Sequence, residues 1–412
     1  MLNSRTLRSL AAIVGVLTLA VAGTAGWLAW SGRPVGEPQA VGFADATLSK
    51  RMTSATVLAL GEATHGTHEF QALRLELLQK VVGAGFTTVA LEEDFGSVAA
   101  VDAWAQGGTG TVEAAVQRFG YAVSRTREMA DLLTWARSYN AGRPEAQRVH
   151  FVGVDLQRPD ADKAVALGWL AKVKPDTAQT LKARLDSLTD DSRLDKTVAA
   201  DVPAALADLD AAIRAADDGT PAASDALHAV QVLEQDRALA ANWSGPARDR
   251  FMFENLRWVV DSAARRGRTH TLLFCHNGHV DRAAQATSAG APTLGSLAAA
   301  AYGDAYRVIG TDAHRTRFLS GDGADREEFS LTIESPYRGM FVGTQAGYLE
   351  MAEASGANAE VVRSRTRMVS AGEQFVGWYA WLPQLHSVQV IPAQAWDAVV
   401  YLEDTTPVTM LG

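Results

Sequence analysis

From about residue 50 onward, short apolar runs alternate with segments in which apolar residues recur at helical spacing, and this alternation limits what the chain can fold into. Runs of this length between polar boundaries are typical of buried strands. The runs that we expect to form strands are TVLALG (56–61), TTVALEED (87–94), VHFVGVDL (149–156), THTLLFCH (269–276), YRVIGTD (306–312) and AVVYLED (398–404). Helical spacing occurs between them at 69–82, 128–139 and 248–265. Because parallel strands need crossover connections and helices provide them, we expect an α/β fold with a mainly parallel central sheet flanked by helices.

The segment from about 160 to 245 differs from this pattern. It is rich in Ala, Asp and Leu and has no run typical of a strand, whereas stretches such as VPAALADLDAAIRAA have an amphipathic helical pattern. We therefore predict a helical insertion. A cap beside the carboxyl edge of the sheet and a purely structural elaboration are equally open interpretations of it.

The first thirty residues have features of a membrane-targeting segment. Arg5 and Arg8 precede a nearly uncharged apolar run at 10–30, which is about the length that crosses a bilayer. Trp27 and Trp30 stand where an interfacial aromatic belt is expected. These features favour an uncleaved transmembrane anchor over a cleavable signal peptide, for which the small residues at 22–26 offer a cleavage site.

Basic residues before the run place the N-terminus in the cytoplasm, so the body lies outside the cytoplasm whether it is membrane-anchored or secreted. The expected organisation is a cytoplasmic N-terminus (1–9), an anchor or signal peptide (10–30), a Pro/Gly-bearing linker (31–50) and a body (51–412) that contains the helical insertion.

Charge and cysteine content exclude several classes of function. The chain has 47 acidic and 38 basic residues, a net charge of -9 and no Lys/Arg-rich block, so we do not expect a nucleic-acid partner. The single cysteine, Cys275, excludes an internal disulfide framework and a Cys-rich zinc site. Nothing in the sequence specifies an oligomeric state.

Acids and histidines follow the first four predicted strands. In α/β sheets, ligands bind outside the carboxyl ends of the strands, so these groups are expected to meet in one cleft, with an arginine from the first helix nearby. The groups are Glu62, His65, Glu92, Asp155, His276 and His279, together with Arg74. A single histidine near a strand end is more often structural than catalytic, but convergence of several favours function. His68 is expected to cap a helix or face solvent, and Glu93 to point away, because adjacent strand residues face opposite sides.

Familiar catalytic devices are missing from the sequence. The chain contains no G-x-S-x-G elbow, no H-E-x-x-H and no G-x-x-x-x-G-K. Three hypotheses stay open. A histidine takes a proton from water for ester or amide hydrolysis, a divalent metal held by His and Glu lowers the pKa of its bound water, or the cleft recognises a cell-envelope ligand without turnover.

In sequence order, the stretches LGEATHGTHEFQALRLELL, GFTTVALEEDFG, RVHFVGVDLQ, RDRFMFENL and HNGHV resemble the erythromycin esterase family over about 55–404. The resemblance implies an α/β core with added helices and no serine triad. It implies that His65 is the general base that activates water and that Glu62 is its acidic partner. It also implies that Arg74, Glu92 and His276 occupy further active-site positions, that His279 is an added member, and that Arg248, Asp249 and Glu254 support the cleft.

The resemblance implies a carboxylic ester hydrolase that acts on a small-molecule ester or lactone without a resident cofactor. The family includes enzymes that open the macrolactone ring of erythromycin-like antibiotics and many members without an assigned substrate. We expect the pocket walls to come from the helical insertion and from 314–348. Because the apolar segment at 10–30 departs from the soluble resistance enzymes, a periplasmic or cell-surface hydrolase is the better interpretation.

Overall fold

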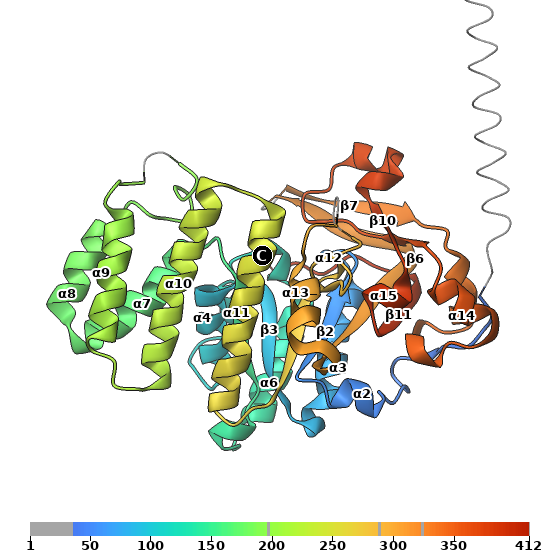
Figure 1. Cartoon of the computed structure of the whole chain (residues 1–412), viewed down its shortest axis with the longest axis horizontal. Helices are drawn as coiled ribbons and strands as arrows, with labels where there is room; N and C mark the ends of the chain where they lie inside the picture. Colours follow the sequence, from blue (N-terminus) through green and yellow to red (C-terminus); the bar gives the residue numbers. More distant parts are fainter. Residues whose placement is uncertain (1–35, 196–197, 287–289, 323–324, 412) are drawn as a thin grey trace, which may run out of the picture.

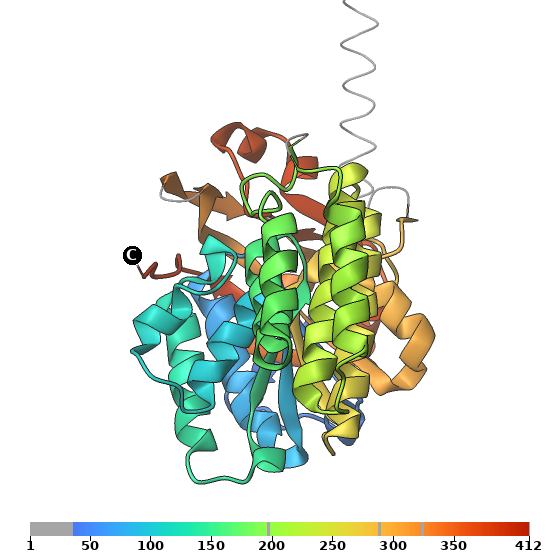
Figure 2. The same cartoon turned by 90° about the vertical axis from the view of Figure 1, so that its left-hand side faces the viewer.

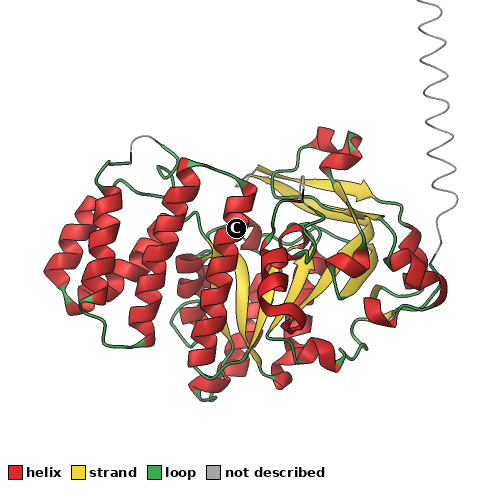
Figure 3. Ribbon diagram, viewed as in Figure 1, coloured by secondary structure: helices red, strands yellow, loops and turns green. Residues whose placement is uncertain are grey.

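The computed structural model describes residues 36–195, 198–286, 290–322 and 325–411. Over these ranges the chain is a mixed α/β fold, in which a nine-stranded sheet lies among helices (Figures 1 and 3). The strand order is β1-β8-β11-β6-β2-β5-β3-β4, with β7 paired to β6 outside this path, and β9 and β10 form a separate two-stranded sheet.

The strands β2, β3, β4, β5, β6 and β11 are those that the sequence predicts, and they are adjacent in the sheet. Every neighbouring pair among them is parallel, so the predicted parallel core is present. Their bounds are Val57–Glu62 (β2), Phe86–Asp94 (β3), His150–Asp155 (β4), His270–His276 (β5), Tyr306–Asp322 (β6) and Ala398–Asp404 (β11).

The remaining strands were not predicted. They are β1 (Val41–Gly42), β7 (Asp325–Thr332), β8 (Ala346–Glu350), β9 (Thr366–Val369) and β10 (Ser387–Val390). β6 runs past its predicted end at residue 312, leaves the parallel sheet and pairs with β7 in antiparallel register. Charged residues in β7 hide its alternating pattern, since a ribbon with an exposed face needs few apolar side chains.

The helices before β4 are α3 (His68–Val81), α4 (Phe95–Ala105), α5 (Val112–Val116) and α6 (Arg127–Asn140). The helices between β4 and β5 are α7 (Pro159–Val173), α8 (Pro175–Arg184), α9 (Val202–Arg214), α10 (Pro221–Ala241) and α11 (Gly245–Arg265). The predicted segments 69–82, 128–139 and 248–265 match α3, α6 and α11 to within three residues, whereas α4 and α5 were not predicted. Shorter helices are α2 (Lys50–Thr53), α12 (Asn277–Val280), α13 (Leu294–Tyr302), α14 (Gly356–Val362) and α15 (Pro392–Ala395).

The sheet separates two apolar cores, which explains why the central strands have continuous apolar runs. In β2, Val57 and Ala59 belong to one core and Leu58 and Leu60 to the other, because successive side chains point to opposite faces. One core includes residues of α7 to α11, and the other includes residues of α3, α4 and α6. A strand buried on both sides in this way holds the loops at its carboxyl end in fixed positions.

Helices α7 to α10 stand side by side beyond the β4 edge of the sheet (Figures 1 and 2). They pack on one another and on α4. Within the described part of the chain, no residue of these four helices lines the site cavity described below.

The predicted anchor or signal peptide at 10–30 lies outside the described residues. Within the described ranges, no helix is both long enough and apolar enough to span a bilayer.

Candidate active site

The predicted site residues come together at the carboxyl ends of the central parallel strands. They surround a cavity of about 430 Å³. The six residues of the predicted set that line it are Glu62, His65, Arg74, Glu92, His276 and His279. β2, β3 and β5 therefore deliver their terminal side chains to one place, as expected for the carboxyl edge of a parallel sheet.

Glu62 and His65 form a hydrogen-bonded pair at the end of β2. Nδ1 of His65 lies 2.6 Å from Oε1 of Glu62, and Nη2 of Arg74 donates to the other carboxylate oxygen at 2.6 Å. Arg74 is buried on α3 and also contacts the sulfur of Met129. Nε2 of His65 has no hydrogen-bond partner among the described residues, and the ring lines the cavity. The carboxylate thus fixes the imidazole from behind and leaves its other nitrogen available to a bound molecule.

The charges around this pair keep Glu62 ionised and make His65 more basic. Burial alone raises the pKa of Glu62, but Arg74 and His65 outweigh it, and the pKa is lowered. Burial alone lowers the pKa of His65, but the Glu62 hydrogen bond and the charge of Glu92 outweigh it, and the pKa is raised. A carboxylate on Nδ1 stabilises the imidazolium that forms when Nε2 takes a proton.

His276 ends β5 and caps the short helix α12. Its Nδ1 accepts the Gly278 N–H at 3.1 Å, and its Nε2 lies 3.2 Å from the Ala63 carbonyl oxygen, which only an Nε2–H can satisfy. These partners fit the neutral ring with the proton on Nε2. Burial, and next the charge of the neighbouring His65, lower the pKa of His276 to about 4. His276 is therefore a neutral donor beside the more basic His65.

Glu92 is the junction between the histidines and α11. Its Oε2 accepts the backbone N–H of His276 at 2.7 Å, and its Oε1 accepts from Arg248 at 2.9 Å. The same Oε1 lies 3.2 Å from Nε2 of His279, whose Nδ1 lies 2.8 Å from Asp249. One carboxylate thus holds the backbone of β5, a histidine of α12 and an arginine of α11.

Ion pairing offsets the cost of burying these charges. Burial raises the pKa of Glu92, but His279 and Arg248 outweigh it and hold the pKa well below its usual range. Burial lowers the pKa of His279, but Glu92 and Asp249 flank the ring and raise its pKa to about 10. The two carboxylates that flank the ring of His279 therefore favour its imidazolium form.

Asp155 lies buried at the end of β4 and, unlike the other predicted groups, does not line the cavity. It pairs with Arg248 and accepts a hydrogen bond from the Tyr121 hydroxyl at 3.0 Å. Gln157 donates to the same hydroxyl oxygen at 3.1 Å and lines the cavity together with Tyr121. Gln157 has a φ of 109°, a conformation that non-glycine residues rarely adopt.

Close backbone approaches explain two glycines of the LGEATHG stretch. A Cβ at Gly61 would lie 2.3 Å from Oδ1 of Asn277, and a Cβ at Gly66 would lie 1.8 Å from the Leu319 carbonyl oxygen. The Asn277 side chain is hydrogen-bonded to β6, because it donates to the Thr311 carbonyl and accepts the Thr311 N–H. The segments that carry His65 and His276 therefore meet at distances that only glycine allows.

The structure corrects three expectations about this region. Glu93 does not point away, because it lines the cavity next to Glu92. The β3–β4 register shifts between Leu91 and Asp94, and such an irregularity breaks the strict alternation of faces. Glu254 lies outside the cleft and accepts from Gln235 of α10. Within the described ranges, no residue of 314–348 forms part of the wall.

Several wall residues were not identified from the sequence. They come from loops and include Tyr121, Ser124, Gln157, Trp243 and the stretch Gly372, Glu373 and Gln374. Trp243 lies just after α10, near the end of the predicted insertion, and is the insertion's residue in the wall. His68, by contrast, behaves as expected, because it begins α3, bonds to Glu128 at 2.6 Å and is not part of the wall.

Within the described residues, no group of three His, Cys, Asp or Glu side chains has a metal-binding arrangement. Both ring nitrogens of His276 and of His279 already have protein partners. A metal here would have to displace an ion pair or a helix cap.

Comparison with known proteins gives a family model and similar solved structures. The model described as erythromycin esterase matches residues 81–405. A Bacillus cereus protein is similar with a TM-score of 0.74 and 21% identity, covering 91% of this chain and 96% of its own. A succinoglycan biosynthesis protein is similar with a TM-score of 0.73 and 17% identity, covering 88% of this chain and 91% of its own.

A mutant of the erythromycin esterase EreC in its open conformation is also similar, with a TM-score of 0.62 and 16% identity, covering 91% of this chain and 99% of its own. At these identities the three structures support the fold alone.

Proposed function

Because this chain belongs to the erythromycin esterase family, we propose that it hydrolyses an ester or lactone with water activated by His65. The observation that carries the proposal is the Glu62–His65 pair, whose free Nε2 borders a cavity of about 430 Å³. A general base needs a water within hydrogen-bond reach and a pKa near the working pH. Glu62 supplies the second requirement by raising the pKa of His65.

The other charged and polar groups of the site orient Glu62, stabilise the developing oxyanion and supply positive charge. Arg74 keeps Glu62 ionised and oriented, because it donates to the carboxylate oxygen that His65 does not use. The neutral His276 carries an N–H beside His65 that can turn to a developing oxyanion. His279 and Arg248 provide fixed positive charge behind Glu92. Water attacks the carbonyl carbon as His65 takes its proton, and the same proton then goes to the leaving alkoxide.

The substrate class follows from the cavity. Pockets of about 300–1,000 Å³ bury most of a drug-sized ligand, and this one combines charged groups with the exposed Trp243 on its wall. We propose a neutral ester or lactone with an apolar body, and macrolactones belong to this class.

The place of action is a separate proposal. The apolar run at 10–30 supports a body held at the outer face of the cytoplasmic membrane. Trp378 and Trp381 are 58% and 84% exposed near the Gly372–Gln374 wall in sequence, and exposed tryptophans suit a membrane interface. Cell fractionation with a protease-accessible tag at the C-terminus tests this location. In cells whose outer layers have been removed, a tag that proteases reach only after lysis of the cytoplasmic membrane would exclude it.

The test of the chemistry compares His65→Ala with His68→Ala, the second histidine of the same stretch. We expect turnover of aryl esters, lactones and erythromycin to fall about 10²- to 10⁴-fold in His65→Ala. His68→Ala should retain turnover, because His68 bonds to Glu128 outside the cavity. Equal activity of the two variants contradicts the proposal.

The same assay with a chelator separates the other two hypotheses. Loss of turnover that added zinc or manganese restores would replace this scheme with a metal-dependent one. Ligand binding without any turnover, unchanged in His65→Ala, would identify a binding module instead.

A further inference from the structure

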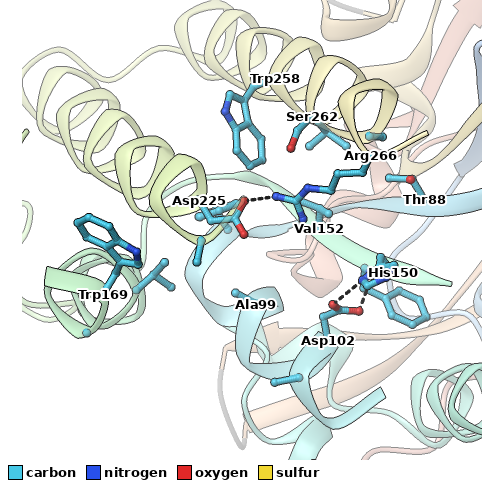
Figure 4. Close-up of a pocket in the computed structure, with 18 of the residues that line it drawn as sticks. Thr88, Ala99, Asp102, His150, Val152, Trp169, Asp225, Trp258, Ser262 and Arg266 are labelled. Carbon is cyan, nitrogen blue, oxygen red and sulfur yellow. Dashed lines mark hydrogen bonds and ion pairs between the residues drawn. The ribbon is translucent and has the colours of Figure 1, made fainter. Parts of the chain in front are cut away.

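A second cavity, of about 480 Å³, lies among α4, α7, α10 and α11 beside the edge strand β4 (Figure 4). Thr88 and His150 border it from the amino-terminal halves of β3 and β4, whereas Glu92 reaches the active site from the far end of β3. Within the described part of the chain, no residue lines both cavities. The second cavity is therefore separate from the catalytic groups.

Aromatic and aliphatic side chains form most of its walls. Trp169 of α7 and Trp258 of α11 face it from different helices, and Val152 faces it from β4 (Figure 4). Trp258 is held in place, because its ring stacks on His228 at 3.8 Å and meets the edge of Phe95 at 5.5 Å. A cavity with walls fixed in this way is preformed for an apolar ligand.

Gly168 lies at the exposed edge of this cavity. It lies within α7, lines the cavity and has no atom within 4 Å of the position that a Cβ would take. Glycine inside a helix costs about 1 kcal/mol relative to alanine. Gly168 is exposed and also borders a neighbouring hollow that Lys163 and Leu167 line, so a larger side chain fits here without a backbone clash.

Two arginines, Arg266 and Arg268, line one end of the cavity. Arg268 is only 5% exposed, and its Nε has no hydrogen-bond partner. Its Nη1 has only long contacts to Glu145, at 3.4 Å to the carbonyl oxygen and 3.8 Å to Oε1. Burial, and next the neighbouring charge of Arg266, lower the pKa of Arg268. A buried guanidinium with partners this weak favours an added anion.

The carboxylates around this end are already engaged. Asp225 pairs with Arg266 at 2.6 Å, as Figure 4 shows. Asp102 accepts the Phe151 N–H at 2.9 Å and a Gln106 N–H at 3.0 Å, and it lies 3.1 Å from His150. Glu145, whose side chain is 64% exposed, lies 2.9 Å from the other nitrogen of His150. Among the described residues, the carboxylate that pairs with Arg268 is this exposed one, and its Oε1 lies 3.8 Å from Nη1.

We propose that this cavity binds an amphipathic monocarboxylate with an unbranched aliphatic tail. The tail lies between the walls that Trp169 and Trp258 form, and the carboxylate meets Arg268 and the unpaired face of Arg266. This proposal does not depend on the catalytic one, since binding here needs neither His65 nor turnover.

Photo-crosslinking of the full-length protein tests it. The probes are decanoate and decanol, each with a diazirine at the tail end, and mass spectrometry identifies the labelled peptides. We expect decanoate to label α7 and the second half of α11 at least tenfold more than decanol does, and unlabelled decanoate to compete. Equal labelling by the two probes, or labelling elsewhere, overturns the proposal.

Matched variants isolate the two halves of the site. Arg268→Met keeps the aliphatic stem and should reduce decanoate labelling about tenfold to the decanol level. Gly168→Phe fills the space without a backbone clash and should abolish labelling, while Gly168→Ala retains it. His65→Ala should also retain it, which separates this cavity from product binding in the active site. Undiminished labelling in a folded Gly168→Phe variant overturns the proposal even if Arg268→Met fails to fold.

Discussion

The imidazole rings of His65 and His276 lie 5.1 Å apart, yet their surroundings move their pKa values in opposite directions. Burial lowers the pKa of both rings. For His65, the hydrogen bond that its Nδ1–H donates to Glu62 and the charge of Glu92 outweigh burial, whereas for His276 the neighbouring His65 adds to it. His65 is therefore the more basic ring of the pair, and His276 stays neutral to lower pH.

This difference predicts the pH dependence of catalysis. His65 must be neutral to act as a base, so kcat/KM should rise with pH through a midpoint above 6.5, the ordinary pKa of histidine. Glu62→Gln removes the carboxylate that raises this pKa, so the midpoint should move to lower pH while the plateau falls about 10²-fold or more. A pH–rate profile of both proteins measures the two effects. An unmoved or raised midpoint in Glu62→Gln contradicts the pairing.

His279 predicts a pH dependence of stability. Its pKa in the folded protein is about 10, against an ordinary value of 6.5. Between pH 6.5 and about 10, the folded state therefore keeps a proton on His279 that the unfolded state releases. The stabilisation is complete below pH 6.5 and is lost as pH rises to about 10, with a slope of up to about 1.4 kcal/mol per pH unit. Denaturant unfolding at several pH values should show a flatter profile for His279→Gln, and parallel profiles would argue against a charged ring.

The raised pKa of Glu93 predicts a second effect of pH on the stability of the folded protein. Burial raises its pKa to about 8, although the Gly120 and Tyr121 N–H groups donate to it. The folded state takes up a proton on Glu93 between pH 4.5 and 8, so the wild-type protein loses stability as pH rises through this range. Glu93→Gln resembles the protonated carboxyl and should be the more stable protein at pH 8 but not at pH 5. Destabilisation by the same amount at both values would show that Glu93 is ionised.

The parallel core could be predicted because its strands are buried on both faces. Such strands have continuous apolar runs, and all six of the predicted runs became neighbours in the sheet. The ribbon of β6 and β7 and the edge strand β8 could not be predicted this way. β7 has one exposed face and charged residues along its length, and the two-residue β1 is too short for any periodicity to be visible.

The candidate site could be predicted where residues lie at strand ends. The strand-end rule brings Glu62, Glu92 and His276 to one edge without knowledge of any loop. Tyr121 and Gln157 were missed because loop conformation, which has no periodic signal, brings them to the cavity. Glu93 was misplaced because a register shift in β3 depends on its neighbour β4 and leaves no mark in the local sequence.

Gly66→Ala tests the close approach beside His65. A Cβ at this position would lie 1.8 Å from the Leu319 carbonyl oxygen, and backbone on both sides leaves no flexible side chain to move away. The Gly66 carbonyl also accepts N–H groups from Leu319 and Val408, so a shift would break both bonds. We expect a loss of unfolding free energy of about 2 kcal/mol or more and a lower kcat. Gly83→Ala, where a Cβ meets nothing within 4 Å, is the matched control and should be neutral or stabilising.

Gln157 holds a strained backbone conformation at the cavity wall, and a pair of variants separates the strain from the side chain. Gln157→Ala removes the side chain that donates to Tyr121 but keeps a Cβ at φ 109°, whereas Gln157→Gly removes both. The glycine variant should therefore be more stable than the alanine variant by about 1 kcal/mol.

If the strain serves the site by presenting the Gln157 amide to the substrate and to Tyr121, both variants should lose kcat/KM to a similar extent, by about tenfold. Strained conformations persist where the surrounding structure requires them, and they gather at functional sites. Denaturant unfolding and steady-state kinetics on the same preparations decide the question. A glycine variant that gains stability and keeps full kcat/KM would show that the conformation at Gln157 has no part in catalysis.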